Sequence, residues 1–163
     1  MKILSTRQLN LAGFLMCAGM MGYALYAEHV LMLMPCPLCV FQRIAVIALS
    51  LIFLVAAIHN SVGYGRYIYA LSILLTATAG AVVAGRHVWL QNLPADQVPS
   101  CGPGFDYIID SFPLSEALGL IFSGSGECAS IDWQFLSLSM PAWVLIVVII
   151  TGIFGIWLNM RRI

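Results

Sequence analysis

The amino-acid sequence predicts an all-α membrane protein, a bundle of four transmembrane helices with one long loop outside the membrane. Of its 163 residues, 61% are hydrophobic and only 9% are charged, whereas a soluble domain carries about 25% charged residues. The few charges leave four uncharged stretches, at residues 8–27, 44–65, 67–85 and 133–160. Each stretch can cross ~30 Å of hydrocarbon at ~1.5 Å per residue. We expect a single membrane domain over residues 1–163, with helices at about 9–27, 40–58, 67–86 and 141–159.

The first stretch has two possible interpretations. Lys2 and Arg7 precede it, and Leu25-Tyr26-Ala27 loosely resembles the cleavage site of a secretory signal. Its apolar run is longer than the roughly 7–15 residues of a signal peptide core. We therefore interpret it as an uncleaved anchor, and cleavage would not change the side on which the later loops lie.

The basic residues predict the orientation of the bundle. Four helices place both termini on one side, together with five of the seven basic residues: Lys2, Arg7, Arg66, Arg161 and Arg162. Only Arg43 and Arg86 fall on the other side. Because loops rich in Lys and Arg remain in the cytoplasm, we expect cytoplasmic termini and outer loops at about 28–39 and 87–140.

The cysteines follow this predicted sidedness. Cys36 and Cys39 lie in the first outer loop, Cys101 and Cys128 lie in the second, and only Cys17 lies in mid-membrane. Exoplasmic compartments are oxidising and allow disulfides to persist. We expect Cys17 to be a small buried apolar residue, and the other four to have redox chemistry.

The second helix is preceded by a C-x-x-C pair, Cys36-Pro-Leu-Cys39. Such a pair can close a strained, labile disulfide, and a helix N-terminus stabilises a thiolate. Arg43 lies one turn after Cys39 on the same face, where its charge would help to keep Cys39 ionised and its N–H groups could bind an electron-poor ligand. The alternatives are a structural disulfide and an arginine that reaches a lipid headgroup.

The third helix ends near His87, which could shuttle protons or bind a ligand beside Arg43, or could be an ordinary interfacial histidine.

The long outer loop that follows is punctuated by Pro and Gly. Within it, residues 105–122 mix apolar and acidic side chains, as in a helix that lies in the membrane interface; a small apolar cap over the bundle is the alternative.

The second cysteine pair, Cys101 and Cys128, lies in glycine-rich segments of this loop. It could open and close without unfolding the bundle, or it could simply staple the loop. A zinc site made of all four outer cysteines is disfavoured, because such sites normally use two short C-x-x-C knuckles and a reducing compartment.

Taken together, these motifs resemble the DsbB family of bacterial disulfide bond formation proteins. The matching elements are "CPLCVFQR" after the first helix, "RHVWLQ" at the end of the third, and "SCGPGF" and "SGECA" in the outer loop before "MPAW". The resemblance covers nearly the whole chain and includes the order of the cysteines. Gln42 stands where the family has a functional glutamate or glutamine, and we assign no role to it from the sequence.

The resemblance implies a quinone-dependent thiol oxidase in the bacterial inner membrane, using ubiquinone or menaquinone. It would re-oxidise a DsbA-like periplasmic oxidase of the thioredoxin fold, a relay that is a known route to an oxidising periplasm. Cys101 would meet the reduced partner, and Cys128 would then engage Cys36. Cys39 would pass electrons to the quinone, with Arg43 and His87 beside the ring.

Three other functions remain open at this point. The chain could be a non-enzymatic membrane protein braced by two disulfides, or a paralogue that serves one dedicated oxidase. A transporter is disfavoured, because the uncharged stretches carry no midplane charge. We expect no resident metal and no nucleic-acid partner.

Overall fold

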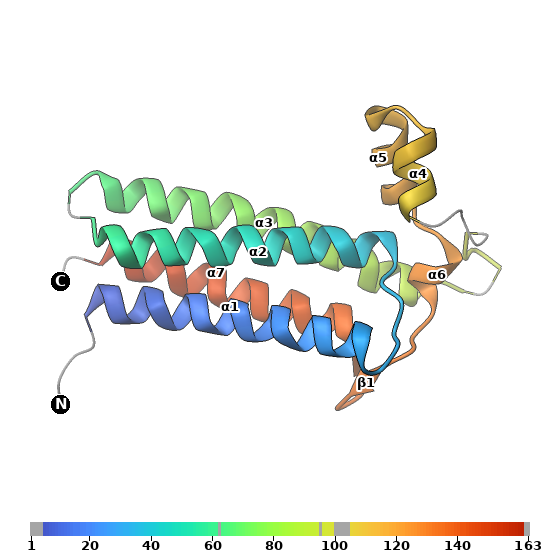
Figure 1. Cartoon of the computed structure of the whole chain (residues 1–163), viewed down its shortest axis with the longest axis horizontal. Helices are drawn as coiled ribbons and strands as arrows, with labels where there is room; N and C mark the ends of the chain where they lie inside the picture. Colours follow the sequence, from blue (N-terminus) through green and yellow to red (C-terminus); the bar gives the residue numbers. More distant parts are fainter. Residues whose placement is uncertain (1–4, 62, 95, 100–104, 162–163) are drawn as a thin grey trace.

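Four long helices form the body of the protein (Figure 1). The computed structural model describes residues 5–61, 63–94, 96–99 and 105–161. Within these ranges, four helices are long and apolar enough to span a membrane: α1 (Thr6–His29), α2 (Pro37–His59), α3 (Gly65–Gln91) and α7 (Met140–Met160). The predicted all-α, four-helix membrane bundle is confirmed.

Capping groups, rather than the edges of the uncharged stretches, determine where the helices begin. Ser5 forms a capping box at the start of α1, which therefore begins at Thr6 instead of near residue 9. Cys36 caps α2, and Pro37 occupies its first turn, where the missing N–H of proline has no cost. Helix α3 continues to Gln91 rather than ending near residue 86, because a charged residue does not by itself stop a helix. His87 therefore lies inside a helix.

Small residues allow the helices to approach closely. Helix α3 packs mainly against α7 and α2, and α1 packs against α2. A Cβ atom added to Gly152 of α7 would lie 2.7 Å from the Ala77 Cβ of α3, and one added to Gly155 would lie 2.7 Å from the Phe53 ring of α2. In lipid, helix association depends on such close packing, because the hydrophobic effect no longer drives helices together.

The membrane core is apolar and contains the fifth cysteine. Cys17 is buried in a cluster with Leu49, Phe53, Ile73 and Val148, which joins all four long helices. This position agrees with the expectation that Cys17 is a small packing residue.

The segment between α3 and α7 forms short elements at one end of the bundle (Figure 1). They are α4 (Phe105–Ser111), α5 (Leu114–Ser123), α6 (Gly126–Ala129) and an antiparallel hairpin of β1 (Gln134–Phe135) and β2 (Leu138–Ser139). Ile108, Ala117 and Ile121 are buried in a second cluster with Leu38 of α2 and Leu90 of α3. Instead of one interfacial helix over 105–122, the chain forms two short helices that pack as a cap on α2 and α3.

The two ends of the bundle differ in chemistry. Helix α1 begins and α7 ends at the end opposite the cap (Figure 1), where Arg7, Arg66 and Arg161 lie. Cys36, Cys39 and Cys128 lie at the cap end. This separation is the one that the sequence suggests, and the orientation of the bundle in the membrane remains a prediction.

Candidate functional site

The C-x-x-C pair lies in the first turn of α2. Cys36 is the N-cap, and its sulfur accepts a hydrogen bond from the Cys39 backbone N–H at 3.4 Å. The extended backbone at Cys36 and the proline after it start the helix there, so residues 36 and 39 face each other across one turn. Both are free thiols, with 3.1 Å between the two Sγ atoms. The pair is thus held at a separation from which little motion is needed to form or break a bond.

His87 of α3 lies against both thiols. Its Nε2 is 3.8 Å from Cys36 Sγ, and its Nδ1 is 4.0 Å from Cys39 Sγ. The imidazole is only 2% exposed, so its polar atoms depend on these protein neighbours. The sequence suggested that His87 could bind a ligand beside Arg43, which stays a prediction; in the fold its polar neighbours are Cys36, Cys39 and Gln42.

Gln42 completes this buried group, although its place in the sequence had assigned no role to it. Its Nε2 lies 2.9 Å from His87 Nδ1, and the side chain is buried. If the amide donates to Nδ1, the ring proton is on Nε2, which faces Cys36. The signal available in the sequence was spacing: Gln42 lies three residues after Cys39, on the same helix face.

Cys128 approaches the pair from the outer segment. Helix α6 carries it into the apolar cluster that contains Cys36 and Leu38, and the Ser125 hydroxyl lies 3.6 Å from its sulfur. Gly124, with φ +90°, makes the turn before α6, and a Cβ there would lie 2.6 Å from a Leu90 methyl. A left-handed turn in such close contact requires glycine, which explains the glycine-rich sequence before Cys128.

The contact between Cys128 and Cys36 polarises both thiols. The Cys36 thiol donates a hydrogen bond to the Cys128 sulfur. This bond, together with contacts from Ser125, outweighs burial and lowers the pKa of Cys128 to about 5. The same bond to Cys128, together with one to Cys39 and burial, raises the pKa of Cys36. The proton therefore stays on Cys36, and Cys128 is the thiolate of the two. A thiolate is the attacking species in disulfide exchange.

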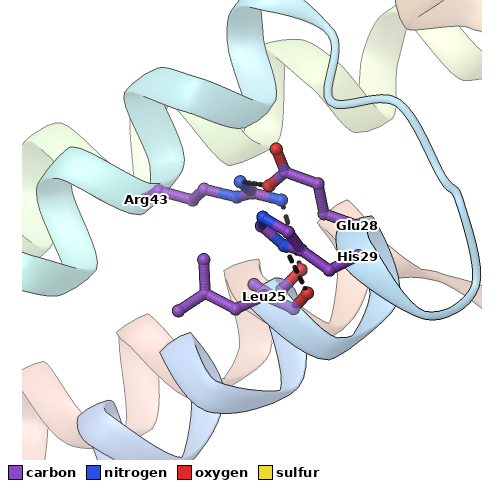
Figure 2. A network of polar contacts seen from close by, with 5 residues as sticks. Leu25, Glu28, His29 and Arg43 are labelled. Carbon is purple, nitrogen blue, oxygen red and sulfur yellow. Dashed lines mark hydrogen bonds and ion pairs between the residues drawn. The ribbon is translucent and has the colours of Figure 1, made fainter.

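Arg43 makes a contact that the sequence did not suggest. Its guanidinium forms a salt bridge with Glu28 at the end of α1, and its Nη2 donates to the Ala24 carbonyl at 3.3 Å. Figure 2 shows the Arg43 side chain reaching from α2 to α1, beside His29, which contacts the Leu25 carbonyl. The effect of Arg43 on Cys39 and on a bound ligand stays a prediction, and the guanidinium also pairs with an acid within reach on the neighbouring helix. Glu28 was not identified as a site residue from the sequence.

A cavity of about 120 Å³ lies beside the C-x-x-C pair. Cys39, Arg43 and His87 all border it, together with apolar side chains of α1, α2 and α7 such as Met20, Val46 and Val144. An engineered apolar cavity of ~150 Å³ holds a benzene molecule, so a single six-membered ring is of the right scale for this space. The Arg43 and His87 side chains thus share a cavity with Cys39 even though Arg43 is paired with Glu28.

An apolar groove continues from this cavity between α1 and α7. Tyr23, Phe135 and Trp143 line the groove, and five residues border both the groove and the cavity: Met20, Ala24, Trp133, Met140 and Val144. The cavity is therefore continuous with a surface suited to a long apolar chain.

Cys101, the fourth cysteine of the predicted site, lies outside the described residues. The fold thus brings together Cys36, Cys39, Cys128 and His87, and Arg43 borders the same cavity as Cys36, Cys39 and His87.

Comparison with known proteins gives one consistent result. The family model described as "Disulfide bond formation protein DsbB" matches residues 6–158. A Disulfide bond formation protein B of Nitrosococcus oceani is 48% identical over 154 residues, covering 94% of this chain and 91% of that protein. One from Methylococcus capsulatus is 48% identical over 164 residues, covering 99% and 100%. One from Chromohalobacter salexigens is 49% identical over 144 residues, covering 88% and 84%.

Proposed function

Because the chain belongs to the DsbB family of disulfide bond formation proteins, we propose that it re-oxidises a DsbA-like periplasmic dithiol and passes the electrons to a membrane quinone. Its role as a multi-pass membrane oxidoreductase in disulfide bond formation follows from the family and from the four spanning helices. The quinone, the partner and the position in the bacterial inner membrane with cytoplasmic termini are the parts that we propose.

The contact of Cys128 with Cys36 is the observation that carries this proposal. In the relay, a reduced partner attacks a Cys101–Cys128 disulfide at Cys101 and releases the Cys128 thiolate. Cys128 then attacks Cys36 in a Cys36–Cys39 disulfide, which frees Cys39 as a thiolate. The partner's second thiol completes its own disulfide by releasing Cys101. Cys101 then attacks Cys128 in the Cys128–Cys36 disulfide, which re-forms the Cys101–Cys128 disulfide and releases Cys36. Two electrons and two protons have then left the partner and arrived at the C-x-x-C pair.

The position of Cys128 supports its role as the attacking group, because its sulfur lies beside Cys36. When Cys36 is in a disulfide its thiol proton is absent, but the Ser125 contacts with the Cys128 sulfur, which favour the thiolate, remain. The apolar packing around Cys128 and Cys36 excludes water from the exchange. Cys36 borders the cavity as well, so electrons that enter through Cys128 reach Cys39 without a large movement of the bundle.

The cavity fits a quinone by the chemistry of its lining. A bound quinone supplies the two-electron oxidant that the thiols need. Arginine has five N–H donors in a planar fork, so the contacts with Glu28 and Ala24 leave donors for a carbonyl oxygen. His87, held by the Gln42 amide, can hold and move a proton beside the cavity. The α1–α7 groove offers apolar contacts for an isoprenoid tail.

The test is turnover by purified full-length protein, followed as reduction of a soluble quinone analogue by a reduced thioredoxin-fold dithiol. Serine variants at Cys36, Cys39, Cys101 and Cys128 should each lose turnover, whereas Cys17→Ser should retain it. Full activity in Cys128→Ser would rule out the relay. Thiol mapping with and without quinone would show directly which cysteines become oxidised.

A further inference from the structure

We propose that the reduced site is also a binding site for a thiophilic divalent cation such as Zn²⁺, with Cys36, Cys39 and His87 as ligands, and that bound metal blocks the thiol relay. Metal binding requires only the two reduced thiols and the imidazole. Inhibition by the metal rests on the proposed function, whereas binding does not.

The geometry of the three side chains carries this inference. One ligand atom from each of Cys36, Cys39 and His87 lies within 4.8 Å of the other two. Ligands of a tetrahedral zinc ion, at ~2.3 Å for sulfur and ~2.0–2.1 Å for nitrogen, lie roughly 3.6–3.8 Å apart. The distance of 3.8 Å between Cys36 Sγ and His87 Nε2 is already in that range, and the 3.1 Å between the two sulfurs must increase slightly. A rotation of either cysteine side chain about its Cα–Cβ bond would provide that change.

The histidine is oriented for this role by Gln42. With Nε2 toward the Cys36 sulfur, Nδ1 faces the Gln42 amide at 2.9 Å. A metal-bound histidine usually donates its other N–H to an oxygen acceptor, which fixes the ring and makes it a better ligand. Turning the Gln42 amide over places its oxygen at Nδ1 and provides that acceptor.

The charge and the surroundings also suit a cation. Binding releases one proton from each thiol, and the two thiolates then balance the charge of the ion, so that little net charge is buried. All three ligands border the cavity, which leaves a fourth position open toward it, and Glu127 and Asp132 line the same cavity. Cys128 contacts Cys36 but is not one of the three side chains whose ligand atoms converge.

This site differs from the four-cysteine zinc site that the sequence disfavours. It uses a histidine from α3, which only the fold brings to the thiols, and it exists only when the C-x-x-C pair is reduced, because a disulfide offers no thiolate. The metal would therefore capture the reduced form and leave the oxidised form free.

The binding test uses full-length protein in detergent. The protein is first reduced, and the reductant is then removed in the absence of air. Co²⁺ is added as a spectroscopic probe, and Zn²⁺ is then added as a competitor. We expect one ion per reduced chain, with the absorption of tetrahedral cobalt–thiolate coordination, and no such absorption from the oxidised protein. Cys36→Ser, Cys39→Ser and His87→Ala should abolish it. Gln42→Leu should weaken zinc binding about 10- to 100-fold, as loss of an outer partner does. The matched control, Cys17→Ser, should bind as the wild type does.

Two further measurements keep the result interpretable if a variant folds poorly. In the wild-type protein, Zn²⁺ should protect Cys36 and Cys39 from alkylation while Cys17 is unaffected. In turnover assays, brief treatment of the reduced protein with Zn²⁺ should stop quinone reduction, and a chelator should restore it. Metal binding that persists in His87→Ala and Cys36→Ser, or protection confined to Cys101 and Cys128, would overturn the assignment. If the wild-type protein is inactive in the turnover assay but still binds the metal, the proposed function is contradicted and the metal site is supported.

Discussion

Replacing Arg43 by alanine tests whether the cavity beside Cys39 holds the quinone. The guanidinium borders the cavity and is anchored to Glu28 on the neighbouring helix (Figure 2). The substitution removes a group that can donate to a carbonyl oxygen and leaves the thiols in place.

The size of the effect follows from the strength of one such hydrogen bond. A hydrogen bond from a charged donor contributes about 1.5–3 kcal/mol, and each ~1.4 kcal/mol is tenfold in binding. The apparent quinone KM should therefore rise about ten- to a hundredfold. The protein should remain folded, because the Arg43 and Glu28 side chains are 21% and 27% exposed, and ion pairs near the surface contribute about 1 kcal/mol or less.

Steady-state rates at varied quinone concentration separate KM from kcat. Arg43→Lys should recover only part of the affinity, since lysine keeps the charge but lacks the planar fork. Glu28→Gln keeps the guanidinium but loosens its anchor, so its KM should rise less than that of Arg43→Ala. The matched control is Arg86→Ala, also at the cap end: its guanidinium binds the carbonyls of Phe122 and Ser123 and does not line the cavity.

An unchanged quinone KM in Arg43→Ala would refute this reasoning. Arg43 would then be only the partner of Glu28 at the membrane edge, and the quinone would have to bind elsewhere. A similar rise of the quinone KM in Arg86→Ala would mean that loss of any basic residue at this end of the bundle weakens quinone binding.

Three further predictions concern the entry of electrons, the thiolate and the packing of the bundle. A DsbA-like protein without its resolving cysteine should be trapped as a mixed disulfide on Cys101, and mass mapping that finds the adduct on Cys36 would reassign the entry point. In metal-free buffer, alkylation of reduced Cys128 by a small reagent should be slow overall because the thiol is buried. Its rate should nevertheless be nearly independent of pH from about 8 to 6 and fall only near pH 5, because the lowered pKa of Cys128 keeps it ionised above that value. Cys36→Ala removes the hydrogen-bond donor, so alkylation of Cys128 should begin to slow at a higher pH. Identical pH profiles in the two proteins would exclude the Cys36 hydrogen bond as the cause of the lowered pKa. Gly152→Ala should destabilise the bundle by about 1–3 kcal/mol, since its Cβ would lie 2.7 Å from Ala77; thermal unfolding in detergent measures this, with Gly19→Ala, which meets nothing within 4 Å, as control.

The sequence by itself determined the class of the fold and the type of chemistry. Uncharged stretches of spanning length predict four helices, because a charge in hydrocarbon is costly. The spacing of Cys36 and Cys39 before a helix, and the exclusion of four cysteines from the spans, predict redox chemistry at one end. These properties depend on residues close together in the chain, where pattern and spacing are sufficient.

The tertiary structure alone decided which distant groups meet. His87 reaches the thiols because α3 runs past its predicted end and lies beside α2, and Cys128 reaches Cys36 because Gly124 turns the chain against Leu90. Arg43 pairs with Glu28, a contact that spacing along α2 did not suggest. Contacts between helices depend on how the helices pack, through small residues such as Gly152, and no local pattern specifies which side chain on one helix will face which on the next.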